Sequence, residues 1–233
     1  MQGWLNRIIG VFILLILIIL GLKLLYYNDP VPTGEHPEKA DILAHKMLDA
    51  INHEAYKNTR YLSWSYRRGK HQYRWDKAMG KARVEWGENI VLVNLNDPDK
   101  SIIKAPDKSI TEPERRELIK QAVSYFNNDS FWLVAPFKVF DKGTKRSLVP
   151  QEDGSNRLLV TYTSGGDTPG DSYLWELNET GLPVSFRMWV QIVPLNGFEA
   201  SWEGWHKTES GALLPQSHKV GPFTLDLGTV RAW

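Results

Sequence analysis

The chain has 233 residues, a formal net charge of +1 and no cysteine. The lack of cysteine excludes disulfides, thiolate metal sites, cysteine nucleophiles and lipidation at an N-terminal cysteine. The nearly neutral charge, with no stripe of Lys and Arg interleaved with aromatic residues, argues against nucleic acid as a partner. Ten tryptophans and an aromatic content of 12% stand out in the composition.

The first 27 residues predict a membrane anchor. The run IIGVFILLILIILGLKLLYY, residues 8–27, carries Lys23 as its one charge, and about 20 residues at 1.5 Å each cross a hydrocarbon core of about 30 Å. The alternative is a cleaved signal peptide, but its apolar region spans about 7–15 residues and ends at a small-x-small site. Arg7 precedes the run and acidic residues follow it, which favours a cytoplasmic N-terminus. We therefore expect a single-pass protein of the inner membrane with its C-terminal domain on the periplasmic side.

A linker and an amphipathic helix follow the anchor. Residues 28–37, NDPVPTGEHP, contain three prolines and a glycine and show no apolar period. Over residues 37–56, apolar side chains recur at helical spacing. His45, Asp49 and His53 share one face of this helix, as a metal site would require, but they lie outside the apolar stripe, as a solvated surface would. We expect the solvated surface and predict no metal and no cofactor.

The segment from Tyr61 to Gly87 predicts an antiparallel meander. Trp64, Trp75 and Trp86 recur every eleven residues. Glycines between them argue against a helical repeat, because glycine costs about 1 kcal/mol relative to alanine inside a helix. Apolar and polar residues alternate around each tryptophan, and this is the period of a strand with one apolar face. We expect the three tryptophans on one face of a sheet that continues through residues 89–95.

A second helix is predicted from Thr111 to about Phe126. The sequence TEPE provides Thr111 as N-cap, Pro113 in the first turn and Glu114 to complete a capping box. The following stretch, FWLVAPFKVFDKG, is interrupted by Pro136, which predicts an edge strand or a loop.

The C-terminal part predicts further strands, separated by turn sequences such as GGDTPGD and NETG. The order is then helix, strands, helix, strands, with links too short for βαβ units. This predicts a mainly β, α+β fold, with one antiparallel sheet curved around the helices. A single domain over residues 38–233 follows, because no second domain is visible after the linker.

The sequence contains no specific catalytic motif. His206 and His218 lie in predicted strands near Glu203 and Glu209, but acid–base catalysis requires a partner within hydrogen-bond reach. No G-x-S-x-G elbow is present, and the glycine-rich residues 165–170 lack the lysine and the strand-to-helix context of a phosphate loop. We predict that the protein is not an enzyme; a hydrolase using one of the two histidines is the alternative.

Three segments resemble the bacterial lipoprotein-carrier superfamily, the LolA/LolB-like proteins: HQYRWDKAMGKARVEW, DSYLWELNETGLPVSFRMWV and FWLVAPFKVFDKG. The last is similar to a segment of uncharacterised envelope relatives of that group. The resemblance covers about residues 37–233 and implies an open half-barrel with a helical lid over an apolar cavity for lipid chains. The soluble carrier of the family has a cleaved signal, and the outer-membrane acceptor of the family has a lipidated cysteine. We expect neither feature in this chain. An inner-membrane anchor argues against shuttling across the periplasm. The roles that remain open are local lipid handling, an assembly role and reuse of the fold without a ligand.

These observations predict an envelope protein that holds a lipid or acylated ligand in an apolar half-barrel; the sequence names no protein partner. Aromatic and Met side chains suit acyl chains because they are bulky and apolar without demanding one geometry. The predicted cavity lining is Trp64, Tyr73, Trp75, Trp86, Trp175, Phe186 and Met188. The predicted lid is Leu118, Val123, Phe126, Trp132 and Phe137. The alternative is an interaction or assembly module that is packed solid and docks a partner through an exposed patch such as FWLVAPF.

Overall fold

The structure, a computed structural model of the chain, describes residues 9–15, 21, 29–104, 110–165, 168–192 and 196–233. Residues 9–15 are helical, and most of the remainder of the predicted anchor, residues 8–27, lies outside the described residues. Among the described residues, no helix combines the length and the apolar character needed to cross a membrane. The anchor therefore stays a prediction from the sequence.

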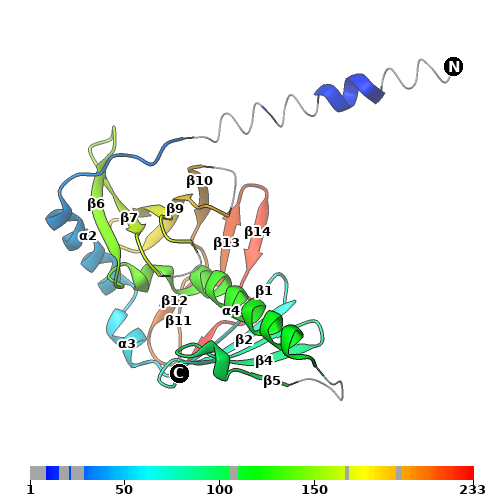
Figure 1. The fold of residues 1–233 in the computed structure, drawn as a ribbon. Helices are drawn as coiled ribbons and strands as arrows, with labels where there is room; N and C mark the ends of the chain where they lie inside the picture. Colours follow the sequence, from blue (N-terminus) through cyan, green and yellow to red (C-terminus); the bar gives the residue numbers. More distant parts are fainter. Residues whose placement is uncertain (1–8, 16–20, 22–28, 105–109, 166–167, 193–195) are drawn as a thin grey trace.

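Two antiparallel sheets make up most of the domain (Figure 1). The six-stranded sheet has the order β15-β1-β2-β3-β4-β5. Its strands are β1 (Tyr61–Tyr66), β2 (His71–Asp76), β3 (Lys81–Trp86), β4 (Asn89–Asn94), β5 (Ile102–Ile103) and β15 (Arg231–Ala232). The predicted meander is confirmed, because Leu62 pairs with Trp75 and Trp64 with Tyr73. Burial alternates along β1 as the sequence period requires.

The seven-stranded sheet has the order β14-β13-β10-β9-β8-β7-β6. Its strands are β6 (Thr144–Pro150), β7 (Asn156–Tyr162), β8 (Ser172–Leu177), β9 (Pro183–Trp189), β10 (Phe198–Ser201), β13 (Ser217–Val220) and β14 (Phe223–Asp226). A separate ribbon contains β11 (His206–Lys207) and β12 (Leu213–Leu214). The mainly antiparallel α+β class is thus confirmed.

The prediction of one continuous sheet is wrong, and the break lies just after β14. The Ser65 amide donates a hydrogen bond to the Leu227 carbonyl, 2.9 Å away, so the two sheets touch at this point. The next residue, Gly228, has a φ of +65°, and a Cβ there would collide with the Ser65 side chain. The chain therefore leaves the seven-stranded sheet at this turn and pairs with β1 only further on, as β15, where Arg231 lies opposite Ser63.

The predicted first helix is divided in two, α2 (Pro37–Ala50) and α3 (His53–Asn58). Asn52 separates them with a φ of 56°, and its side chain accepts a hydrogen bond from the Ala55 amide. Its amide nitrogen also donates to the Gly211 carbonyl at 2.9 Å. Asparagine tolerates the left-handed conformation, and its side chain caps the helix that follows, so the break has a local cause. The hydrogen bond to Gly211 then holds the break in place.

The second helix is longer than predicted. Helix α4 spans Glu112–Val134 and begins with the predicted Thr111–Glu114 capping box. It passes without a break into the 3-10 helix η2 (Ala135–Lys138), so the expected edge strand or loop at FWLVAPFKVFDKG is wrong. Pro136 lies in the first turn of η2, where the missing amide proton is not needed. A further 3-10 helix, η1 (Pro98–Lys100), precedes β5.

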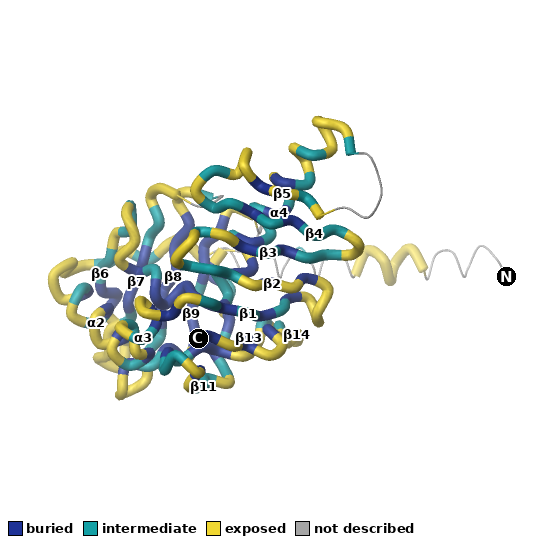
Figure 2. The backbone as a smooth tube through the Cα atoms, turned by 90° about the horizontal axis from the view of Figure 1, so that it is seen from below, coloured by how far each residue is buried: buried dark blue, intermediate teal, exposed yellow. Residues whose placement is uncertain are grey.

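Helix α4 reaches from the six-stranded sheet to the seven-stranded sheet, and α2 packs on β6 and β7 (Figure 1). Buried residues concentrate in β7, β8 and β9 and recur at alternate positions along β1 (Figure 2). One hydrophobic core joins both sheets, α2 and α4. A small second cluster around Trp189 lies apart from it.

Candidate functional site

The predicted lining residues of the six-stranded sheet all face α4. Trp64 and Tyr73 are buried, with 3% and 4% of their surface exposed, and Trp75 and Trp86 are half-buried. The Phe126 ring lies 5.3 Å from Trp75 and 6.0 Å from Trp64 between ring centroids. The prediction that the tryptophans of the meander share one face is confirmed, and that face is covered by α4.

The predicted lining residues of the seven-stranded sheet meet α4 near its C-terminal end. Trp175, Phe186 and Met188 are all buried. Phe186 lies 5.0 Å from Trp175 and 5.7 Å from Trp132 of α4. The sequence analysis missed Trp202, which is buried 5.2 Å from Trp175. The aromatic residues of FEASWEGWHK, just after a strand pattern, were the signal that could have found it.

The predicted lid residues divide between two places. Phe126 is buried on the core side of α4, Trp132 faces Phe186, and Leu118 and Val123 lie partly buried along the same helix. Phe137 lies in η2 instead and stacks on Tyr56 of α3 with 4.0 Å between ring centroids. The stretch FWLVAPF is mostly buried, so the exposed docking patch expected for an interaction module is not there.

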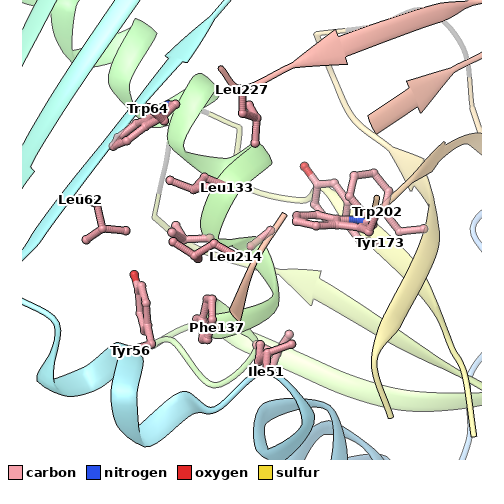
Figure 3. Close-up of a cluster of buried hydrophobic side chains, with 14 of the residues drawn as sticks. Ile51, Tyr56, Leu62, Trp64, Leu133, Phe137, Tyr173, Trp202, Leu214 and Leu227 are labelled. Carbon is pink, nitrogen blue, oxygen red and sulfur yellow. The ribbon is translucent and has the colours of Figure 1, made fainter. Parts of the chain in front are cut away.

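These side chains pack against one another in the state described. Figure 3 shows Trp64 and Trp202 approaching from the two sheets, with Leu133 of α4 and Leu214 of β12 between them in this view. Helix α4 and its neighbours therefore fill the space between the sheets. A ligand in this interior requires that α4 moves.

A buried polar cluster fastens α4 to β2. Asp129 is 1% exposed, and its carboxylate accepts hydrogen bonds from the Tyr73 hydroxyl at 2.5 Å and from Nδ1 of His71 at 2.7 Å. His71 also stacks on Tyr125 of α4 at 4.3 Å. Burial, and then the charge of Asp129, raise the pKa of Tyr73 far above its usual value, so its hydroxyl keeps the proton that it donates. Charge-assisted hydrogen bonds of this kind fix the position of α4 along β2.

His218 makes a second polar junction with α4. Its two ring nitrogens lie 2.8 Å from the carbonyl oxygens of Ser201 and of Trp132. Burial lowers the pKa of His218 to about 4, although both carbonyls act in the opposite direction. The neutral ring has one N–H and so donates to one of the two carbonyls. This predicted catalytic candidate is thus a buried link between β13 and α4.

The other histidine candidate lines an outer groove. His206, Ser217 and Asp226 surround a groove of about 590 Å³, so a histidine, a hydroxyl and a carboxylate do come together. Nε2 of His206 lies 3.1 Å from the Val230 carbonyl, its Nδ1 is buried, and in the described part of the chain no hydrogen bond joins the three side chains. A base in contact with a nucleophile, the requirement for a hydrolase, is not formed in this arrangement.

The predicted partners Glu203 and Glu209 form ion pairs with Lys219 and Arg231 instead. Within the described residues, no group of three His, Cys, Asp or Glu side chains is placed to hold a metal.

No family model and no curated protein matches the chain. The resemblance to lipoprotein carriers therefore stays a prediction from the sequence.

Proposed function

We propose that the chain is a membrane-anchored binding protein of the cell envelope that takes an acyl chain into the apolar interior beneath α4. One observation supports this most: aromatic side chains from both sheets and from α4 converge on a single interior. Trp75 and Trp175 belong to different sheets, yet each lies in the core that α4 covers. Such an interior offers a long apolar surface with little demand on ligand shape.

The free energy lost when α4 leaves the interior and the free energy gained when an acyl chain takes its place are of similar size. Displacing α4 uncovers Ile119, Phe126, Leu133 and Val134, each worth roughly 1.5–3 kcal/mol when buried, and also partly buried side chains such as Phe131 and Trp132. An acyl chain of about a dozen methylenes regains roughly 10 kcal/mol at about 0.8 kcal/mol per methylene. An acyl chain of about a dozen methylenes therefore competes with α4 for the same interior, and a much shorter acyl chain does not.

The N-terminal segment orients the domain toward the membrane. The Asp29 carbonyl accepts a hydrogen bond from the Trp189 indole at 2.7 Å, and the Asp29 carboxylate pairs with Arg187 of β9. Ile192 and Phe223 are 65% and 72% exposed. Because Ala200 pairs with Val220, the turn before Phe223 lies at the same end of the sheet as the connection after β9 (Figure 1). This end, where the predicted anchor joins, is the one that faces the bilayer.

The test is photocrosslinking of the full chain in vesicles that contain a phospholipid with a diazirine on its acyl chain. We expect labelled peptides from β8, β9 and α4 in addition to those from residues 1–28. Trp75→Asp should abolish the interior labels, and Ile42→Asp, at a site that is 70% exposed, should not. Circular dichroism checks that both variants keep their sheets. Labels confined to residues 1–28 and the membrane-facing loops would refute the proposal.

The second candidate is a non-enzymatic interaction or assembly module with the same fold and no ligand. The packed state of the interior favours it. It predicts that no lipid labels the interior at any vesicle composition.

A further inference from the structure

Four indole N–H groups are buried in the core without a hydrogen-bond partner among the described residues: those of Trp64, Trp75, Trp175 and Trp202. Three of these side chains, Trp64, Trp175 and Trp202, are at most 3% exposed. Two tryptophans outside this set, Trp189 and Trp205, satisfy their donors within the protein. The indole of Trp189 donates to the Asp29 carbonyl at 2.7 Å, and that of Trp205 to the Pro183 carbonyl at 3.0 Å.

The unpaired donors occur on both walls of the interior. On the six-stranded sheet, Trp64 and Trp75 lie beside Phe126 of α4. On the opposite wall of the interior, the ring centroids of Trp175 and Trp202 lie 5.2 Å apart. Figure 3 shows Trp64 and Trp202 on opposite sides of Leu133 of α4. The buried hydroxyl of Tyr162 is also unpaired and lies near Tyr173.

An indole N–H donates and never accepts. About nine in ten buried polar groups in folded proteins have a partner, so four unpaired donors in one interior require an explanation. A hydrocarbon chain offers no acceptor, and an alkylammonium head offers only positive charge. A carboxylate or the carbonyl of an acyl group offers acceptor oxygens that match these donors.

We infer that the ligand of this interior is an acyl group that buries its carbonyl or carboxylate oxygens against these indoles, with Trp175 and Trp202 as the principal donors. The inference rests on the proposed binding function and adds the chemical class of the ligand. The interior thus distinguishes an acyl ester from an alkane of equal length. The buried carboxylate of Asp129 on α4 is already paired with His71 and Tyr73 and does not attract a cationic head group.

The test compares two competitors of the diazirine phospholipid, methyl laurate and tridecane, on the full chain in vesicles, corrected for their measured partition into the bilayer. We expect methyl laurate to bind about tenfold more tightly, which corresponds to 1.4 kcal/mol. Trp175→Phe should reduce this ratio severalfold, because it removes an N–H and keeps an aromatic ring. Trp205→Phe is the matched control, since the Trp205 indole already donates to the Pro183 carbonyl and Trp205 is not among the lining residues, and the ratio should not change.

The outcomes separate this inference from the proposed function. Equal binding of the two competitors, or an equal loss of both in Trp175→Phe, overturns the acceptor inference and leaves the binding function standing. Failure of both to displace the probe overturns both. A phospholipid and an acylated peptide, added separately, identify the source of the acyl carbonyl.

A measurement on the wild-type chain covers the case in which Trp175→Phe does not fold. Ultraviolet resonance Raman spectra report hydrogen bonding of indole N–H groups. Methyl laurate should shift this signal toward the hydrogen-bonded form and tridecane should not. A fully hydrogen-bonded signal before any ligand is added would overturn the inference.

Discussion

Replacing Asp129 should loosen α4 more than any other single polar change in the core. Its carboxylate accepts two hydrogen bonds from β2, from Tyr73 and from His71, and almost none of it reaches solvent. Asp129→Ala removes both and leaves the buried Tyr73 hydroxyl and His71 imidazole with only each other as partner, 3.3 Å apart. Buried hydrogen bonds to a carboxylate contribute about 1.5–3 kcal/mol each, so we expect a loss of about 3–5 kcal/mol. Asp129→Asn keeps the shape and one acceptor, so we expect about 1.5–3 kcal/mol.

The assay is urea unfolding of the full chain in nanodiscs, followed by tryptophan fluorescence. Asp141→Ala is the control, because Asp141 is half-exposed and its ion pair with Lys138 should contribute less than about 1 kcal/mol. Amide exchange should also speed up in α4 of Asp129→Asn before it does in β1 to β3. A loss in Asp129→Ala no larger than that of the Asp141 control would refute the reasoning that this cluster fastens α4.

Three further changes test separate parts of the structure. Thr111→Ala removes the capping box and should cost about 1 kcal/mol, with faster amide exchange in the first turn of α4; uniform exchange along the helix would contradict this. The pKa of His218 falls to about 4 from a usual value of 6.5, so the unfolded chain takes up the proton first and stability is lost as the pH falls through this window. The loss due to His218 should reach roughly 3 kcal/mol at pH 4, and His218→Gln should lose less by that amount, as urea midpoints of both proteins at pH 7 and pH 4 would show. Trp189→Phe removes the bond to Asp29 and should make the segment before α2 sensitive to limited proteolysis; unchanged cleavage would count against this contact as the tether.

The features that the sequence predicts correctly have local causes. Strand alternation around Trp64 and Trp75 needs only neighbouring residues, and the turns between these strands carry their own glycines. The capping box at Thr111 is likewise a four-residue signal. These elements form in the structure where the sequence places them, because no distant contact competes with the local preference.

The features that the sequence misses depend on distant partners. The helix break at Asn52 is fixed by Gly211, 159 residues away, and Asp129 inside α4 is satisfied by β2. The split into two sheets depends on the close approach of Gly228 to Ser65. The expectation of an edge strand or a loop at Pro136 failed because proline also fits the first turn of a helix. The periodicity of a single sequence carries no information about contacts between residues that lie far apart in the chain.

The buried carboxylate of Asp129 is the feature that a purely structural helix would not need. Replacing a buried ionic group and its partners by well-packed apolar residues is often neutral or stabilising, so the cluster is poor evidence for stability alone. Its effect is on position: α4 reaches full bonding with Tyr73 and His71 at only one place along β2. Sliding by one turn would leave a charge buried and unpaired, whereas full departure returns Asp129 to water. The proposed exchange of α4 with an acyl chain requires two states of the helix, seated and released, and the bonds of Asp129 to Tyr73 and His71 would define the seated one.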